Sequence, residues 1–448
     1  MTRRQDLTNG DVRGHLWRLG MPMVIGIIAV MSIGLADAYF LGQLGTAELA
    51  AISFSFPVTF AIASVAIGLG AGASSVVSRV IGTGDHQRVR RLCTDSLALS
   101  VLVVAVLSVV GWLTSRHLFS AMGAEGEVLD LVVAYMDIWY IGMPFLVVPM
   151  VAGSLLRANG DARIPSLTMV LSAVVNILLD PILIFGLGPI PAMGMEGAAW
   201  ATLVARGFSM VLALSVLIFR ERLLILALAP WAEIRSSWQQ VVAVGVPASL
   251  ANMINPLCLA ILTAILARFG SETVAAFGVA GRIEALAAIP MLALSASIGP
   301  ITGQNMGAGL PHRIRTAVID SFLFCIGWGA AMAILFWLFG AAIAGVFSDD
   351  PAVINDIVRY LQIVPITLGG YGVVIIAAAT YNALGRGYQA MGFYLLRSAL
   401  FYVPLAWLAS FWLPAWGVFA AIAVANVLSG AVIYRLSLSG IDQPPKKG

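Results

Sequence analysis

An acidic residue inside a long apolar run is the first feature of this sequence that could carry chemistry. Asp37 lies in the apolar stretch 16–41, and a run of about 20 apolar residues is long enough to cross a bilayer as one helix. A carboxylate in that setting costs roughly 2.5–3.5 kcal/mol, so it normally faces a protein interior or a water-filled cavity. It also readily takes up a proton or a cation. We predict that Asp37 is the coupling residue of an ion-driven exporter; an acid reaching the outer interface from a helix end is the alternative.

A second polar pair follows in another apolar stretch. Asn176 and Asp180 are four residues apart, so they share one face of a helix, and Pro181 frees backbone carbonyls upstream of it. Hard cations such as Na⁺ prefer oxygen ligands. Asp37, Asn176, Asp180 and the hydroxyl of Thr202 would supply such a set. The alternative is that Asn176 and Asp180 only bond neighbouring helices, because spacing alone does not show that the two stretches touch.

The composition defines the class of protein that holds these residues. Of 448 residues, 60% are hydrophobic and only 10% are charged, whereas soluble domains carry about 25% charge. The chain is therefore expected to be an all-α membrane protein with no soluble domain. It has neither a nucleophile–base set nor a nucleotide-binding loop, so we predict that it is not an enzyme and needs no cofactor beyond a coupling ion. The first apolar run lacks a cleavage site and should stay as an uncleaved anchor.

Twelve apolar stretches can be counted as transmembrane helices. Most arginines and lysines fall in alternate connections, which places these connections and both termini on the cytoplasmic side. The opposite connections are rich in acids. The expected spans are 16–41, 52–78, 94–115, 130–156, 165–188, 195–219, 241–267, 274–303, 316–345, 357–382, 390–412 and 417–436.

The two halves of the chain repeat each other at a constant offset of 225 residues. Gly20 matches Gly245, and the segment Gly82-Thr-Gly84 matches 307–309. An offset of six helices gives repeats of the same orientation. We therefore predict two six-helix lobes related by pseudo-two-fold symmetry: an N-terminal lobe at 1–219, a cytoplasmic linker at 220–240, and a C-terminal lobe with a short tail at 241–448.

The candidate ion ligands break this repeat. At the same offset, Asp37 corresponds to Leu262 and Asp180 corresponds to Leu405. The common scaffold therefore does not need acids at these two places. This asymmetry favours a functional role over packing for the polar residues of the first lobe.

Taken together, the motifs resemble the multidrug and toxic compound extrusion (MATE) family over essentially the whole chain. The resemblance rests on the order and spacing of several segments: Gly20-Met-Pro22, Asp37 in LADAYFLGQLGTAELAA, Gly82-Thr-Gly84-Asp85, LRANGD at 156–161, Asn176-x3-Asp180-Pro181, GAAWAT at 197–202 and GQNMGA at 303–308.

This resemblance implies a 12-helix antiporter that exports organic, often cationic compounds against Na⁺ or H⁺. It further implies that Asp37, Asn176, Asp180 and Thr202 correspond to the first-lobe cation site of the DinF-like branch. Pro22 corresponds to the residue at which the first helix is proposed to bend. The NorM-like branch has acids in spans seven and ten, where this chain has none. A second-lobe cation site is therefore not expected.

Other charged residues lie inside the predicted spans of the second lobe. Arg282 and Glu284 are two residues apart and point away from each other. Glu284, with Asn255 as the nearest polar residue of span seven, could contact a substrate, or Glu284 could brace the second lobe. Three further charges lie nearer predicted span ends and are expected at solvated or interfacial positions: Arg206, Asp320 and Arg397.

The leading interpretation is a monomeric, multi-pass transporter of small organic substrates in the cytoplasmic (inner) membrane, without a nucleic-acid partner. A dedicated natural-product exporter and a flippase for lipid-linked substrates are the alternatives. A flippase is expected to line its cavity with several cationic residues for phosphates, and intramembrane arginine is sparse here. No filter or pore-ring pattern typical of a channel is visible.

Overall fold

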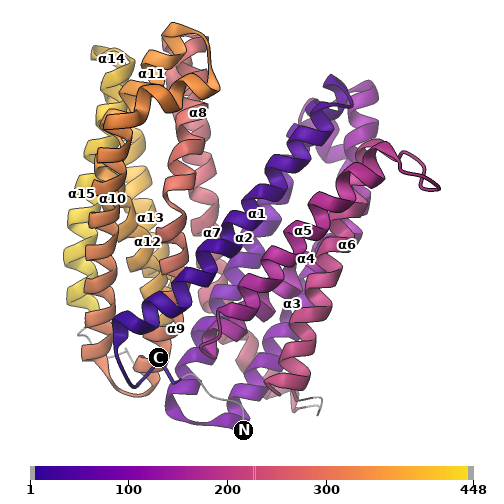
Figure 1. Cartoon of the computed structure of the whole chain (residues 1–448). Helices are drawn as coiled ribbons and strands as arrows, with labels where there is room; N and C mark the ends of the chain where they lie inside the picture. The colour runs from indigo at the N-terminus through magenta and orange to yellow at the C-terminus, as the bar shows by residue number, and fades with distance from the viewer. Residues whose placement is uncertain (1–5, 226, 228, 442–448) are drawn as a thin grey trace.

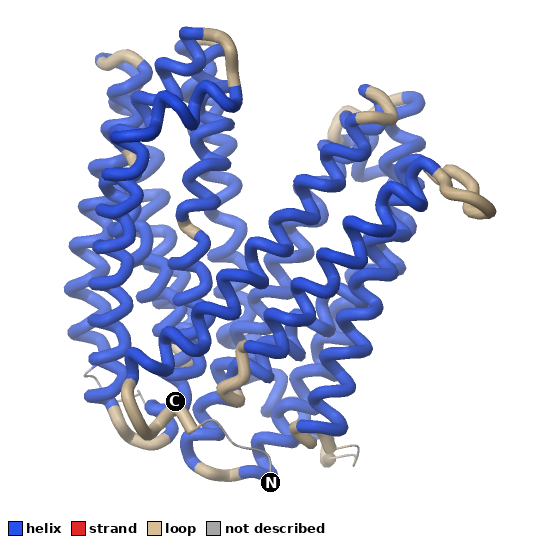
Figure 2. Tube along the Cα trace, viewed as in Figure 1, coloured by secondary structure: helices blue, strands red, loops and turns tan. Residues whose placement is uncertain are grey.

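The computed structural model describes residues 6–225, 227 and 229–441, which are almost entirely helical (Figure 1, Figure 2). The first half contains α1 (Val12–Gly42), α2 (Thr46–Thr83), α3 (His86–Ala121), α4 (Gly126–Ala158), α5 (Arg163–Phe185) and α6 (Gly194–Ser215), which continues into a π-helical turn at Val216–Arg220. The second half contains α7 (Trp231–Leu266), α8 (Ser271–Ala287), α9 (Ile289–Gly307), α10 (Pro311–Phe347), α11 (Pro351–Ile363), α12 (Leu368–Ala383), α13 (Gly387–Leu395), a π-helical segment at Leu396–Tyr402, α14 (Val403–Trp412) and α15 (Ala415–Ile441).

Each predicted span matches one of these helices or two in succession, although the span 165–188 runs past the end of α5, so the prediction of an all-α membrane protein with twelve spans is confirmed. Eleven spans are long apolar helices or helix pairs, and the twelfth is the pair α8 and α9, which is bent by 44° at its junction. Pro290 lies in the first turn of α9, where a ring without an N–H ends the hydrogen-bond ladder of the helix before it. Within the described residues, no strand is present beyond an isolated bridge between Leu187 and Ile190.

The helices form two bundles, α1–α6 and α7–α15, which meet near the chain ends and diverge toward the opposite end (Figure 1). Each bundle has its own apolar core. The first helix of each lobe begins in the other lobe's core: Leu16 and Leu19 of α1 belong to the second core, and Val241 of α7 belongs to the first. Helix α1 therefore links both lobes. Its second half, which contains Asp37, packs against α5.

The contact between the lobes itself follows the internal repeat. Gly82 of α2 packs so tightly on α9 that an added Cβ would lie 2.0 Å from the carbonyl oxygen of Gln304. Gly307 of α9 packs equally tightly on α2, where its Cβ would lie 1.9 Å from the carbonyl oxygen of Arg79. The offset of 225 residues relates one pair to the other, because Gly82 corresponds to Gly307 and Arg79 corresponds to Gln304. Two reciprocal contacts of this kind are what a pseudo-two-fold axis between α2 and α9 produces.

The connection between the lobes is shorter than the sequence suggests. The helical part of the first lobe ends at Arg220, and α7 already begins at Trp231. The indole Nε1 of Trp238 donates a hydrogen bond of 2.9 Å to the carbonyl oxygen of Asp95 in α3. Thus the second half of the predicted linker is helical and packs against the first lobe.

Candidate functional site

Three helices of the first lobe bring the four predicted ligands together. Asp37 comes from α1, Asn176 and Asp180 come from α5, and Thr202 comes from α6. The carboxyl groups of Asp37 and Asp180 lie within hydrogen-bonding distance of each other. The amide Nδ2 of Asn176 lies 3.3 Å from Oδ1 of Asp180 and 3.2 Å from Oγ1 of Thr202, and donates to both. These four residues, which we call the first-lobe polar cluster, form one continuous group.

Local sequence explains how this cluster is built. The spacing of four residues places Asn176 and Asp180 on the inward face of α5, where both are buried. Helix α1 approaches α5 closely at Gly26, whose added Cβ would lie 3.2 Å from Cα of Ser166. A glycine at this contact allows the two helix backbones to come together. This close approach brings Asp37, eleven residues further along α1, beside Asp180.

Three buried oxygen atoms of the cluster have no hydrogen-bond partner among the residues that the structure describes. They are Oδ1 of Asp37, Oδ2 of Asp180 and Oδ1 of Asn176. Buried polar atoms are normally paired, and an exception indicates strain, function or an unseen partner. Two carboxyl groups in contact cannot both be charged unless a cation lies between them, and otherwise they share a proton. The arrangement can therefore exchange a proton for a hard cation bound by these oxygens.

The donor set suits an alkali cation better than a transition metal. Within the described part of the chain, no three His, Cys, Asp or Glu side chains gather as metal ligands. The first-lobe polar cluster instead offers two carboxyl groups, an amide oxygen and a hydroxyl, all of which are hard oxygen ligands. The residues thus fit Na⁺ as a transported ion, and equally fit a shared proton.

Sequence reasoning missed two neighbours of the cluster. Tyr135 of α4 is buried and interacts electrostatically with Asp37 and Asp180. The guanidinium of Arg206 interacts electrostatically with the carboxyl group of Asp37 and lies 5.1 Å above the ring of Trp139. The expectation that Arg206 is solvated or interfacial is therefore wrong.

A signal for both neighbours was present in the sequence. Arg206 follows Thr202 by four residues, and Trp139 follows Tyr135 by four, so each pair shares a helix face. The spacing rule that linked Asn176 to Asp180 applies to α4 and α6 as well. This rule places Arg206 and Tyr135 on the sides of α6 and α4 that face the first-lobe polar cluster.

The second lobe has a different polar network, built around Arg397. This side chain is only 5% exposed, so the expectation of a solvated or interfacial position is wrong here too. Its Nε donates to Oδ1 of Asn426 at 3.0 Å and its Nη1 donates to Oδ1 of Asn255 at 3.4 Å. The guanidinium also lies 4.4 Å above the ring of Tyr371. A π-helical segment at 396–402 carries Arg397, and such segments often mark functional or strained positions.

Glu284 and Asn255, the predicted second-lobe substrate contacts, are both engaged within this network. The hydroxyl of Tyr360 in α11 donates a short hydrogen bond to Oε2 of Glu284, and Arg397 acts on the same carboxylate electrostatically. Nδ2 of Asn255 donates to the hydroxyl of Tyr371 at 3.1 Å. This placement fits the bracing alternative for Glu284 better than a contact with substrate.

Pro22, the predicted bend, lies inside α1 where that helix passes from the second core to the first lobe. Helix α1 is continuous across this proline. The hydroxyl of Ser166 in α5 donates a short hydrogen bond to the carbonyl oxygen of Pro22. The third charge expected at an interface, Asp320, accepts hydrogen bonds of 3.0 and 2.9 Å from Arg13 near the start of α1.

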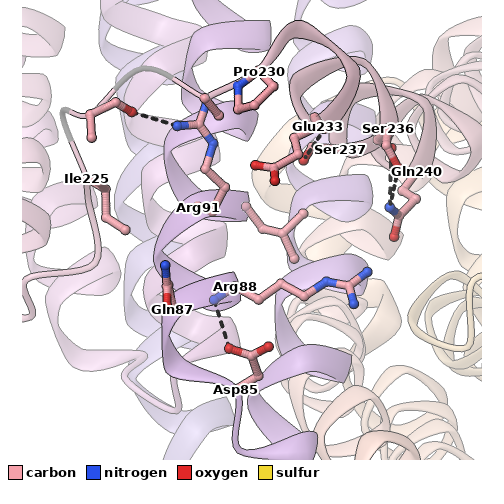
Figure 3. Close-up of a pocket in the computed structure, with 13 residues that line it drawn as sticks. Asp85, Gln87, Arg88, Arg91, Ile225, Pro230, Glu233, Ser236, Ser237 and Gln240 are labelled. Carbon is pink, nitrogen blue, oxygen red and sulfur yellow. Dashed lines mark hydrogen bonds between the residues drawn. The ribbon is translucent and has the colours of Figure 1, made fainter.

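A separate cavity of about 530 Å³ lies between the beginnings of α3 and α7 and the chain segment that precedes α7 (Figure 3). None of the predicted site residues lines it. Its charged lining residues are two acids and two arginines: Asp85, Arg88, Arg91 and Glu233. Arg91 is already engaged by the carbonyl oxygen of Ala227 at 2.7 Å. The balanced charge gives this cavity no preference for a cation or an anion.

The fold and the first-lobe polar cluster together define a class of protein: a membrane transporter with two six-helix lobes and a buried ionisable site. The sequence pattern of the MatE family matches residues 22–182 and 247–408. The chain therefore belongs to the MatE family of transporters, so the prediction that it is not an enzyme is also confirmed. The more specific assignment to the DinF-like branch stays a prediction.

Similar proteins agree with this membership over three quarters of the chain or more. A protein of Shewanella oneidensis named "FAD transporter" is 38% identical and covers 98% of this chain and 97% of its own. A probable multidrug resistance protein of Bacillus subtilis, YoeA, is 26% identical over 76% of this chain and 74% of its own.

Solved structures match as well. The Vibrio cholerae MATE transporter VcmN in the bent form superposes with a TM-score of 0.91 at 29% identity, over 96% of this chain and 98% of that one. An outward-facing multidrug resistance MATE family transporter superposes with a TM-score of 0.93 at 27% identity, over 99% and 100% of the two chains.

Proposed function

We propose that this chain is an ion-coupled exporter that uses the first-lobe polar cluster to exchange a proton or Na⁺ for its organic substrate. The single observation that carries this proposal is the contact between the carboxyl groups of Asp37 and Asp180 beside buried oxygens without partners. Two acids in contact hold a proton or a cation. Because Asp37 lies on the helix that links both lobes, a change of its charge would repack α1 and alter how the lobes meet.

The charge distribution supports the membrane orientation that we propose. Most arginines of the described residues lie at the end where α1 begins and α15 finishes, and this distribution favours the cytoplasmic side for that end. The lobes then diverge toward the outside (Figure 1). We place the protein as a monomer in the inner membrane with both termini cytoplasmic.

A flavin dinucleotide is the substrate that we propose. The supporting observation is the relative from Shewanella oneidensis named for FAD transport, which is 38% identical over nearly the whole of both chains. Cationic drugs, which the sequence motifs favour, are the second candidate, because relatives at lower identity are named as multidrug resistance or export proteins.

Reconstituted protein tests both parts of the proposal. Proteoliposomes are loaded with FAD or with the cationic dye ethidium, and release is followed while a pH gradient or a Na⁺ gradient is imposed separately. We expect release of FAD that depends on one of the two gradients. Gradient-driven release of ethidium alone would select the second candidate, and no gradient dependence with either compound would contradict ion coupling.

A further inference from the structure

Helix α8 presents one charged side chain that the mechanism above does not use. Arg282 is exposed, and no hydrogen bond, ion pair or ring contact links it to any described residue. It lies eleven residues after the start of α8 at Ser271, which is about 16 Å along a helix. That distance is about half of a ~30 Å hydrocarbon core. A free guanidinium at this depth is costly unless it faces water or a ligand.

The rest of the α8 surface indicates that this face does not meet lipid. Gly278 and Gly281 are beside Arg282, and an added Cβ at either would find no atom within 4 Å. Within α8, which is fully described, Leu286 is the only exposed large apolar residue. Helix α10 differs, since large side chains such as Trp337, Leu338 and Ile334 dominate its exposed surface. Apart from Leu286, the exposed residues of α8 are small or polar, and this surface is unlike the lipid-facing surface of α10.

The position of α8 supports the same conclusion. In Figure 1, α8 lies on the flank of the second lobe that is nearest to α1, where the two bundles diverge. Its opposite face is fixed by the hydrogen bond between Glu284 and Tyr360 of α11. Residues two apart on a helix do not share a face. Anchoring Glu284 inward therefore turns Arg282 away from the second core and toward the space between the lobes.

We propose that Arg282 is the substrate-selecting residue of the second lobe and binds an anionic group, most suitably a phosphate, of the transported compound. Guanidinium groups bind phosphate oxygens with two parallel hydrogen bonds. The inference rests on the proposed function and adds the chemical class of group that is recognised. Glu284 is then a positioning residue for Arg282 and does not itself contact the substrate.

Equilibrium binding tests this assignment without any ion gradient. FAD carries a diphosphate, FMN a monophosphate and riboflavin none, while all three share the isoalloxazine ring. Their binding to the purified full-length protein in nanodiscs is followed by flavin fluorescence polarisation. We expect the parent to bind FAD and FMN more tightly than riboflavin. Arg282→Gln should weaken FAD binding by about tenfold or more, the loss of one charge-assisted pair.

The controls separate charge recognition from general damage. Arg282→Gln should leave riboflavin affinity within about twofold of the parent, and Arg282→Lys should recover part of the FAD affinity. Arg163→Gln removes an exposed arginine at the start of α5 and should change neither affinity. Equal weakening of FAD and riboflavin by Arg282→Gln, or unchanged FAD binding, would overturn the assignment.

The same experiment distinguishes this inference from the proposed function. A parent that binds no flavin, or binds FAD and riboflavin equally, also overturns the role of Arg282. Coupling at Asp37 would then still be measurable with ethidium release. Conversely, a parent with the expected flavin preference but no gradient dependence would contradict ion coupling while supporting anion recognition by Arg282.

Discussion

The two lobes share a scaffold but use their buried charges in opposite ways. Tyr135 of the first lobe and Tyr360 of the second are equivalent at the offset of 225 residues, and each lies beside an acid. In the first lobe, that tyrosine is near two carboxyl groups whose outer oxygens lack partners. In the second lobe, one carboxylate is held by the tyrosine and by the charge of Arg397. One lobe therefore has buried carboxyl oxygens without partners among the described residues, and the other has a satisfied network.

This difference indicates a functional role for the charges of the first lobe and a structural role for those of the second. A buried charge pair that is fully bonded keeps the same protonation state and rigidifies its surroundings. A pair of like charges cannot be satisfied without a mobile ion. We infer that ion exchange changes the first lobe, while the second lobe holds α8 in a fixed orientation.

A large effect is expected at Asp180, equal to or somewhat smaller than the effect at Asp37. Asp180→Asn keeps the size of the side chain but removes its titratable group, so the pair with Asp37 can no longer exchange a proton for a cation. We expect gradient-driven efflux to fall to background, or nearly so, while the protein still reaches the membrane. Resistance and efflux assays at matched expression measure this. Asp137→Asn, a change at another partly buried acid of the first lobe, should keep transport; equal loss in both variants would contradict a specific role for Asp180.

A large loss of stability is expected when Arg397 is replaced. Arg397→Gln leaves Glu284 buried without its cation and removes a donor from Asn426 or Asn255. Unsatisfied buried groups cost about 1–3 kcal/mol each, so the thermal midpoint should fall clearly. Adding Glu284→Gln to this variant should recover part of the loss because the two groups are coupled. A midpoint equal to that of the parent would show that the second-lobe network is not structural.

The equivalent tyrosines sharpen the comparison. Tyr360→Phe removes the hydrogen bond to Glu284 and should lower stability by about 0.5–1.5 kcal/mol with modest effects on transport. Tyr135→Phe should alter the ion dependence of transport while changing stability less. Unfolding and transport are measured on both variants. The reverse pattern would place the exchangeable site in the second lobe.

The smallest effect is expected at Thr202. Thr202→Val keeps the shape but removes the hydroxyl that accepts a hydrogen bond from Asn176. Loss of about 1 kcal/mol corresponds to roughly a fivefold change in the apparent affinity for the coupling ion. This affinity is measured as the concentration of Na⁺ or H⁺ at which transport is half-saturated. Thr202→Ser should behave like the parent, and a Ser variant as impaired as Val would argue that packing explains the effect.

The fold was predictable because bilayer physics leaves few choices. Spans of about 20 apolar residues must be helices, and the internal offset then fixes two like lobes. The bend between α8 and α9 and the helical start of α7 were not predicted, because a proline or a polar stretch does not reveal whether the chain bends or continues as helix. In these regions, tertiary contacts such as that of Trp238 with α3 determine whether the chain continues as a helix.

The site was predictable only in part. Acids in apolar runs are visible in sequence, so Asp37 and Asp180 stood out. Arginines near span ends were assigned to the interface, because snorkelling is the usual behaviour of long cationic side chains. Arg206 and Arg397 do not reach the interface. The ring of Trp139 binds the guanidinium of Arg206, and the ring of Tyr371 and the amide of Asn426 bind that of Arg397. Spacing places Arg206 on the same face of α6 as Thr202, but it does not show which groups of distant helices bind each guanidinium.

We propose that the first lobe holds the coupling site. Purified parent, Asp37→Asn and Glu284→Gln proteins are reconstituted at equal density, and substrate release is measured under separately imposed pH and Na⁺ gradients. We predict that Asp37→Asn loses gradient-driven release, whereas Glu284→Gln retains appreciable release. If Asp37→Asn transports like the parent while Glu284→Gln is inactive, the coupling site lies in the second lobe and the claim is wrong.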